Sequence, residues 1–287
     1  MIAVFKHELR NYFNSLTAYI FIGFLLLFVG IGSLLYNVNS ALANFEYVLR
    51  YICIGMTVFI PILTMKILTE EKKQKTDQLL YSLPLSGTSV ILGKYLTLVI
   101  VFAIPCLIMC FYPLLFSQYG DVYLPTSYGS LFAFFVLGCA LIAIGMFVSS
   151  ITDNMGFAAG ISIPLLLFNY YSVSLAEYVS TSAVGSLIVL AVLIFIISMI
   201  IEKVTKNENL STIVTIVLAL GVGAAYLLDY DLFEGLLPNI MTSLSLFERF
   251  YTFVNGVFDL RAIVFYLTVI VFFLFLSVQS FEKRRYN

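Results

Sequence analysis

The chain has few of the side chains that common enzyme chemistries require. Its 287 residues include one histidine, His7, and no tryptophan, and only 11% of them are charged. A His-Glu-x-x-His zinc motif is absent, and a serine protease triad would need a second histidine beyond the one at the N-terminus. These absences argue against metalloprotease and serine hydrolase activity.

The charge balance and the cysteines exclude two further classes. The formal net charge is −1, so there is no global basic field of the kind that attracts nucleic acid. The four cysteines, Cys53, Cys106, Cys110 and Cys139, all lie inside apolar runs. With no histidine near them they make a poor metal site, and we interpret them as small apolar packing residues without a disulfide framework.

The apolar runs also lack Lys, Arg, Asp, Glu and His in their interiors. An ion-coupled carrier needs an ionisable group at membrane depth to bind and release its ion. One stretch, Gly87 to Tyr95, resembles a phosphate-binding loop, but five residues separate Gly87 from Gly93 and Tyr95 stands where Ser or Thr should bind magnesium. We therefore expect no nucleotide site in this chain.

What the chain does have is apolar sequence of membrane-spanning length. It is 61% hydrophobic with a mean hydropathy of +1.03, whereas soluble domains carry about 25% charged residues. Runs of about 20 apolar residues predict transmembrane helices. The fold class is therefore an all-α polytopic membrane protein of about eight spans, predicted at 16–36, 49–66, 93–117, 129–150, 155–173, 182–201, 210–228 and 262–280.

The basic residues predict the orientation. With the N-terminus inside and eight spans, twelve of the fifteen Lys and Arg residues fall in inner segments, as the positive-inside rule requires. Both termini are then cytoplasmic in a plasma-membrane protein. Residues 1–14 read as an amphipathic helix along the cytoplasmic interface or as a merely charged leader, and the first apolar run is too long for a signal peptide.

Residues 229–260 lie outside in this topology and are only semi-apolar. The spacing places Leu244, Phe247, Tyr251 and Val254 on one helical face, while charges such as Glu248 would be costly at the bilayer centre. We expect short helices here that either dip into the outer leaflet or lie on its surface.

The longest charged, helix-compatible run lies between spans 2 and 3. It predicts a helix over Thr69–Leu80, with Glu71 and Lys75 paired at i, i+4. Pro84 should stop this helix, and Ser86 should cap the next one. From the residues alone, the segment reads equally as a rigid helix that transmits displacement or as a solvated loop.

Three sequence patterns carry a family resemblance. The first starts at Pro61-Ile-Leu-Thr-Met65-Lys66, continues through Glu70-Glu71-Lys72-Lys73 and Thr76-x-x-Leu79-Leu80-x-Ser82-x-Pro84, and ends in Leu92-Gly93-Lys94. The second is Ser149-Ser-Ile-Thr152. The third runs from Leu246-Phe247 through Gly256-Val-Phe-Asp259-Leu260-Arg261 to Glu282-Lys-Arg-Arg285. Over roughly 1–170 and 236–287 the chain resembles the ABC-2 family of transporter permeases, most closely its gliding-motility-type (GldF-like) branch.

The resemblance implies a single transmembrane permease domain over 1–287, with a six-span core and an inserted helix pair at about 177–228. It implies that residues 66–92 form a cytoplasmic coupling segment that docks on an ATPase subunit. Two ATPase copies would bind ATP and magnesium, so this chain needs no cofactor. A second permease chain, and an auxiliary membrane protein with an extracytoplasmic domain, are further implied partners. The implied docking residues are Glu70, Glu71, Lys72, Lys75, Thr76, Leu79, Leu80 and Pro84.

The sequence departs from the family pattern at Lys75, where the family usually has glycine, so the local turn is open. The cargo is not readable, although Asn169, Tyr170 and Tyr171 form a polar-aromatic patch that would suit an apolar or amphipathic molecule. The prediction is a permease of an ATP-driven exporter. A secondary carrier and a non-transporting scaffold or sensor that anchors an ATPase remain as alternatives.

Overall fold

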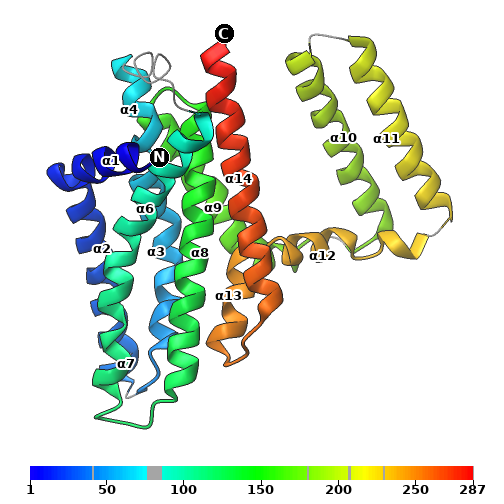
Figure 1. Ribbon diagram of the computed structural model, residues 1–287. Helices are drawn as coiled ribbons and strands as arrows, with labels where there is room; N and C mark the ends of the chain where they lie inside the picture. Colours follow the sequence, from blue (N-terminus) through cyan, green and yellow to red (C-terminus); the bar gives the residue numbers. More distant parts are fainter. Residues whose placement is uncertain (41, 76–85, 180, 206–207, 229, 287) are drawn as a thin grey trace. The chain divides into compact units, whose positions relative to one another are not determined.

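The computed structural model describes residues 1–40, 42–75, 86–179, 181–205, 208–228 and 230–286, and the regular structure in these ranges is helical (Figure 1). The chain forms two compact units. Unit 1 comprises residues 1–170 and 246–287, and unit 2 comprises residues 171–245. The chain thus leaves unit 1 once and returns to it.

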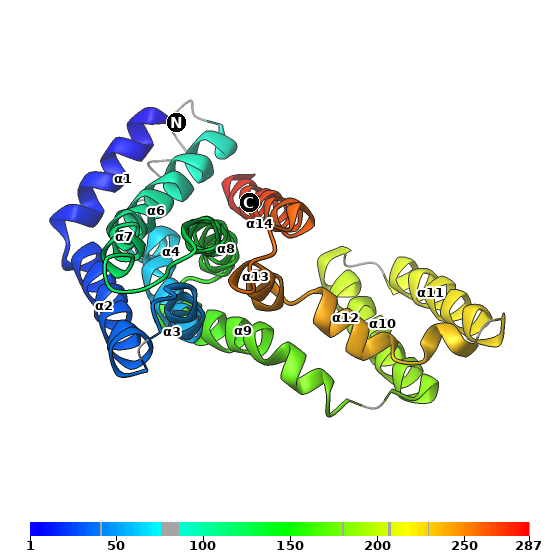
Figure 2. The same ribbon diagram turned by 90° about the horizontal axis from the view of Figure 1, so that it is seen from below.

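Unit 1 is a bundle around one central helix, α8, which packs against α3, α6, α13 and α14 (Figure 2). Both termini and the short helix α4 lie at the same end of this bundle (Figure 1). The elements of unit 1 are α1 (Ile2–Asn14), α2 (Leu16–Ser33), a π-helical turn (Leu34–Asn39), α3 (Glu46–Thr64), α4 (Lys66–Gln74), α6 (Gly87–Met109), α7 (Phe111–Phe116), α8 (Leu124–Ile151), most of α9 (Met155–Ala176), α13 (Leu246–Val254) and α14 (Leu260–Tyr286).

Helix α8 is central because it is apolar on all sides and rich in small residues. In its most apolar stretch 83% of the residues are buried, against 33% in α2 and 28% in α14. A Cβ added at Gly145 would lie 2.3 Å from Thr64 Oγ1 of α3, so the two helices meet at a distance that only glycine allows. Small residues let helix backbones approach closely in membrane proteins.

Replacing Gly145 with alanine should therefore destabilise the bundle, although alanine favours helices by about 1 kcal/mol elsewhere. Overpacking against Thr64 should lower the free energy of unfolding by about 1–3 kcal/mol. Thermal unfolding of the detergent-solubilised protein measures the change. The matched control is Gly30→Ala in α2, where nothing lies within 4 Å of the added Cβ; equal behaviour of the two variants would contradict the close-packing account.

Six helices in the described residues are long and apolar enough to cross a membrane, at Leu16–Asn39, Glu46–Gln74, Gly87–Phe116, Leu124–Ile151, Met155–Ala176 and Leu260–Arg284. The sequence predicted eight. The two further stretches are helical, as α10 (Ala183–Thr205) and α11 (Glu208–Leu228), but in the part of these helices whose residues are described only Ala183–Val192 qualifies, as a shorter apolar helix.

Unit 2 consists of the end of α9, the paired helices α10 and α11, a 3₁₀ turn (Tyr230–Phe233) and α12 (Leu236–Ser243). The Tyr226 and Phe233 rings make an edge contact at 5.3 Å between centroids, and Gly235 N donates to Thr181 O at 2.8 Å. These contacts close the helix pair onto the segment that follows it.

Residues 230–260 contain short helices, as the sequence predicted. The predicted face is confirmed in part, because Phe247 and Val254 are buried and Tyr251 packs against the core, whereas Leu244 does not. In α13 the buried side chains are Leu246, Phe247, Phe250, Phe253 and Val254, and they pack towards α8 and α3. Leu244 is 58% exposed because α13 begins two residues later, at Leu246. Ser130 Oγ of α8 donates to Phe253 O at 3.0 Å and fixes the end of α13.

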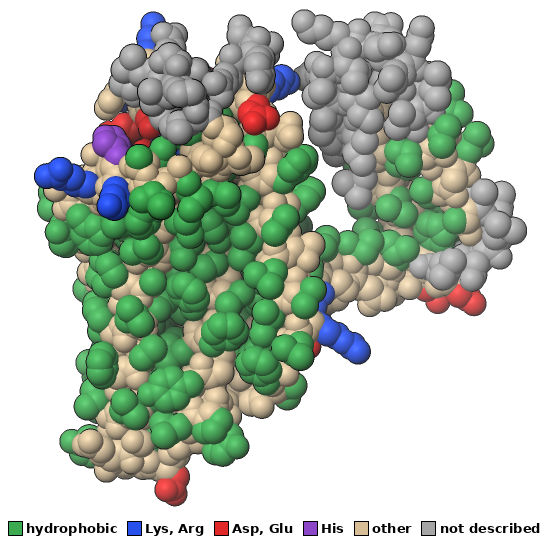
Figure 3. Space-filling model, in the orientation of Figure 1, with side chains coloured by type: hydrophobic (Ala, Val, Ile, Leu, Met, Phe, Trp, Pro, Cys, Tyr) green, Lys and Arg blue, Asp and Glu red, His purple; other side chains and the backbone are tan. Residues whose placement is uncertain are grey.

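The flank of unit 1 is covered with hydrophobic side chains, and lysine, arginine and histidine gather at the end that holds the termini (Figure 3). In α2, for example, Leu16, Tyr19 and Phe24 are 74%, 56% and 51% exposed. A helical bundle with so much exposed apolar surface is stable only in a lipid environment.

Candidate functional site

The charged run between the second and third spans begins as a straight continuation of α3. Only Met65 separates α3 from α4, and its N–H donates to Pro61 O at 2.8 Å, so the helical hydrogen bonding carries on. Helix-forming residues follow, and Lys66 and Glu70 pair at 3.3 Å. Ile67, Leu68 and Thr69 are buried. The first part of the segment is therefore a packed helix and not a solvated loop.

The helix predicted over Thr69–Leu80 is confirmed as far as Gln74 and is interrupted at Lys75. The helix ends at Gln74, because Lys75 adopts φ +56° and ψ +21° in the left-handed region. Its N–H donates back to Glu71 O and Lys72 O, which closes the last turn. Lys75 thus makes the turn for which the resembled family usually has glycine, and residues 76–80 lie outside the described residues.

A glycine at this position should stabilise the protein. The left-handed conformation costs an L-residue about 1–2 kcal/mol, and glycine is largely spared this cost. The free energy of unfolding of the Lys75→Gly variant should therefore be about 1 kcal/mol higher than that of the Lys75→Ala variant. Thermal or denaturant unfolding in detergent measures the difference. The alanine variant is the control for loss of the side chain, and an alanine variant as stable as the glycine variant would contradict a strained turn.

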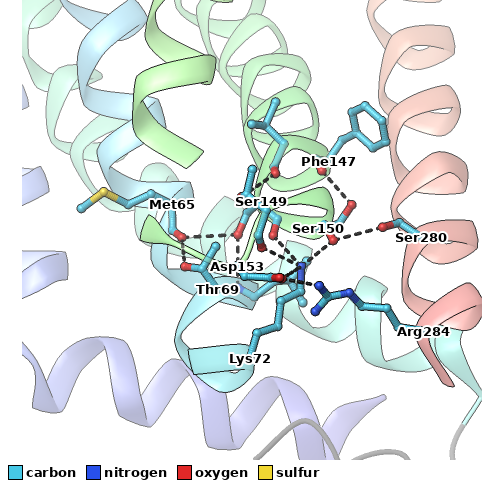
Figure 4. A network of polar contacts seen from close by, with 12 residues as sticks. Met65, Thr69, Lys72, Phe147, Ser149, Ser150, Asp153, Ser280 and Arg284 are labelled. Carbon is cyan, nitrogen blue, oxygen red and sulfur yellow. Dashed lines mark hydrogen bonds and ion pairs between the residues drawn. The ribbon is translucent and has the colours of Figure 1, made fainter. Parts of the chain in front are cut away.

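One face of α4 is fastened to the end of α8 by Lys72 (Figure 4). Its ammonium donates to Ser149 O at 3.1 Å and to Thr152 O at 2.9 Å, and also to Ser150 O. The last carbonyls of a helix have no intrahelical donor and carry the negative end of its dipole. Lys72 is therefore a C-terminal cap of α8 supplied by another helix, and its side chain is only 8% exposed.

Neighbouring side chains complete this contact, which we call the Lys72 junction. Leu68 N of α4 donates to Ser149 Oγ at 3.3 Å, and Ser280 Oγ of α14 donates to Ser150 O at 3.0 Å. Asp153, just after α8, lies 4.0 Å from the Lys72 ammonium and also pairs with Arg284 of α14. The junction comprises Lys72, Ser149, Ser150, Thr152, Asp153, Ser280 and Arg284, and it joins α4, α8 and α14.

A second polar contact of α4 is an ion cluster, the Lys94 junction, made of Glu8, Glu71 and Lys94. The fully buried Lys94 ammonium of α6 lies 2.6 Å from Glu8 Oε1 of α1 and 2.7 Å from Glu71 Oε1 of α4. It also donates to Ile67 O at 3.1 Å. Three helices distant in sequence are therefore held by one cation.

This geometry corrects two sequence predictions. Glu71 pairs with Lys94 and not with Lys75, which the left-handed turn carries away from the helix. The sequence predicted a span that begins at residue 93, so that Lys94 would lie at its end and not inside it. The helix begins at Gly87 with Ser86 as its cap, as predicted, since Ser89 N donates to Ser86 Oγ. Lys94 consequently lies two turns inside the helix, so the span does contain a buried charge.

Gly93 allows α1 to come close enough for this pairing. A Cβ added at Gly93 would lie 3.1 Å from Met1 O and 3.3 Å from Phe5 N, both of which belong to the start of the chain. The sequence Gly93-Lys94 thus combines a close backbone approach with the cation that holds the approaching helix. This gives a physical role to the Leu-Gly-Lys pattern.

Removing the Lys94 charge should be strongly destabilising, because it leaves the buried Glu8 and the mostly buried Glu71 carboxylates facing each other without a cation. We expect Lys94→Met to lower the free energy of unfolding by about 3–5 kcal/mol. The matched control is Lys73→Met, an exposed lysine of α4, which should change stability by less than about 0.5 kcal/mol. Thermal unfolding in detergent measures both.

The triple variant Lys94→Met, Glu8→Gln, Glu71→Gln separates charge from packing. Because it removes all three charges, it should recover a large part of the stability lost in Lys94→Met. A Lys94→Met protein as stable as the Lys73→Met control would show that the cluster does not hold the helices together.

The other predicted site residues are distributed as follows. Glu70 is 37% exposed by side chain, and Lys75 is exposed. Thr76, Leu79, Leu80 and Pro84 lie outside the described residues. In α9, Asn169 Oδ1 accepts from Leu246 N at 3.0 Å, and the Tyr170 ring makes an edge contact with Phe247 at 5.1 Å. Tyr171, in unit 2, is 44% exposed.

The sequence reasoning did not assign roles to Glu8, Lys94, Ser149, Ser280 and Arg284. Three of them lie in patterns that were noted: Lys94 in Leu92-Gly93-Lys94, Ser149 in Ser149-Ser-Ile-Thr152, and Arg284 in the basic C-terminal end. Glu8 gave a weaker signal: it falls on the same face as Val4 and Tyr12, which are both buried. An acidic residue on the apolar side of an amphipathic helix indicates a buried cation nearby.

The bundle and its junctions define a multi-pass α-helical membrane protein whose ion pairs, among the described residues, lie at one end. A family model described as ABC-2 family transporter protein matches residues 2–178, well over half of the chain. The chain therefore belongs to this family of transporter membrane proteins. No curated protein matches the chain.

Proposed function

We propose that the chain is the permease subunit of an ATP-driven exporter, moved by a separate cytoplasmic ATPase. The observation that carries this proposal is the double fastening of α4. Helix α4 continues α3 directly, Lys72 joins it to α8 and α14, and Glu71 joins it to α6 and, through Lys94, to α1. A push on α4 would therefore reach several spans at once.

The burial of these contacts supports the hypothesis that α4 transmits displacement to the spans. The ion pairs of Lys94 are little screened by water and salt, since its side chain is 0% exposed and those of Glu8 and Glu71 are 10% and 20% exposed. Lys72, whose side chain is 8% exposed, is held by its hydrogen bonds to the carbonyls at the end of α8. A solvated loop would dissipate a displacement, whereas a helix held on two faces transmits it. This favours a coupling element over a segment whose lysines only set topology.

The proposed ATPase surface follows α4 along the chain. Glu71 and Lys72 are committed to the junctions, so the described side chains that would face the ATPase are Glu70 and Lys75. The family resemblance adds Thr76, Leu79, Leu80 and Pro84. Charges for orientation and leucines for an apolar anchor are typical of such an interface. Two ATPase copies, with ATP and magnesium, would act on two permease chains.

The remaining parts of the proposal come from the sequence. The positive-inside rule places the end with both termini and α4 in the cytoplasm. Residues 177–228 would be an inserted helix pair that raises the number of spans to eight, in a single permease domain of the gliding-motility-type branch. An auxiliary membrane protein with an extracytoplasmic domain would complete the complex.

The cargo path is proposed at the α9 patch. Asn169 and Tyr170 contact Leu246 and Phe247 of α13, so cargo that reached this patch would meet a polar amide beside aromatic rings. An apolar or amphipathic cargo suits these side chains. The alternatives are a secondary carrier and a scaffold that anchors an ATPase without transport. Vesicle transport with and without ATP distinguishes the exporter from both.

The docking surface is tested by the double variant Leu79→Asp, Leu80→Asp. Two carboxylates at the apolar anchor should reduce co-purification of the ATPase subunit in mild detergent by at least tenfold, because each buried charge costs more than the contact supplies. The protein should still insert in the membrane. The matched control is Tyr119→Asp, Tyr123→Asp, at side chains 88% and 69% exposed in the loop before α8; normal ATPase binding by the leucine variant would refute the assignment.

A further inference from the structure

Helix α1 has one face that the bundle buries and one that it leaves open. Val4, Glu8 and Tyr12, spaced four residues apart, are buried, and Tyr12 donates to Leu63 O at 3.0 Å. Lys6 and Arg10, also four residues apart, are exposed on another line of the helix. Ile2 continues this outer line and is 66% exposed. The exposed line of α1 thus begins with an apolar residue, Ile2, and continues with two cations, Lys6 and Arg10.

The described part of the chain supplies no acidic partner to this face. Among the described residues, Lys6 and Arg10 form no ion pair. The acidic residues of α1 and α4 are committed elsewhere: Glu8 and Glu71 bind the Lys94 ammonium, and Glu70 pairs with Lys66 at 3.3 Å. His7 lies beside this line, with Nδ1 3.5 Å from Asn11 Nδ2.

The cations lie at the margin of the lipid-facing surface. Helix α1 ends at Asn14, and α2 begins with Leu16, Tyr19 and Ile20, which are 74%, 56% and 48% exposed. Figure 3 shows basic side chains directly beside the hydrophobic flank. In a bilayer this margin is the head-group layer, where Lys and Arg of amphipathic helices meet lipid phosphates.

We propose that the outer face of α1, formed by Ile2, Lys6 and Arg10, binds anionic phospholipid head groups. Two cations four residues apart, with no ion pair to the described residues, complement phosphate charge, and the exposed Ile2 would contact the acyl chains. The inner face of the same helix holds Glu8 against Lys94, so the bound lipid would lie across one helix from the α4 contact. The proposal does not depend on the ATPase or on transport.

The absence of tryptophan allows a direct test. Ile2→Trp places a single tryptophan on the outer face of α1, and quenching by brominated phospholipids then reports which lipid occupies that place. In mixed vesicles, brominated phosphatidylglycerol should quench more strongly than brominated phosphatidylcholine. Each cation should contribute about fivefold to the relative affinity, so Lys6→Gln, Arg10→Gln should bring the preference close to one.

Two controls make the result specific. Lys283→Gln removes an exposed cation of α14 at the same end and should leave the preference unchanged. A tryptophan at Leu267 of α14, which is 52% exposed, should show no such preference. Equal quenching by the two lipids at position 2, a preference that survives Lys6→Gln, Arg10→Gln, or an equal preference at position 267 would overturn the proposal. Unchanged gel-filtration elution verifies that each variant is folded.

Discussion

The burial of the Lys94 ammonium is the constraint on which the end of the bundle depends. A buried cation costs several kcal/mol in lost hydration unless ion pairs and hydrogen bonds replace the water. Here the replacements come from Glu8, Glu71 and Ile67 O, which belong to α1 and α4. Lys94 can be buried only if both helices are in place, so one electrostatic requirement fixes the arrangement of three elements.

Lys72 applies the same logic to the helix dipole. Consecutive residues of a helix point about 100° apart, so Glu71 and Lys72 reach two different sides of α4. One pairs with the cation of α6, and the other caps the carbonyls at the end of α8. Because α4 continues α3 without a break, it is part of the bundle and not an appendage. Helix α4 is therefore held to the bundle on two of its sides.

Local features of the fold could be predicted from the sequence, and pairings across the fold could not. Apolar runs predicted six spans that the structure contains, and Ser86 was a correct helix cap. The sequence predicted a Glu71–Lys75 pair because helical periodicity identifies only partners within a few residues. The observed partner of Glu71 is Lys94, which is 23 residues away in the sequence. The other partner of Lys94, Glu8, is 86 residues away from it. The left-handed turn at Lys75 was hidden because a lysine rarely adopts it. Lys94 was overlooked because a charge near a predicted span boundary is ordinarily solvated.

The family patterns acquire a common explanation once these pairings are known. Gly93 allows the close approach of α1, and Lys94 pairs with Glu8 of α1. Lys72 donates to the carbonyls of Ser149 and Thr152. Arg284 pairs with Asp153, which lies beside these carbonyls. Patterns that lie far apart in the sequence are thus halves of two contacts that meet on α4. A helix that served only to connect two spans would need neither contact, since its exposed charges would be satisfied by water. The buried charges of Lys72 and Lys94 on two sides of α4 are therefore best explained by a need to hold α4 rigidly against the bundle.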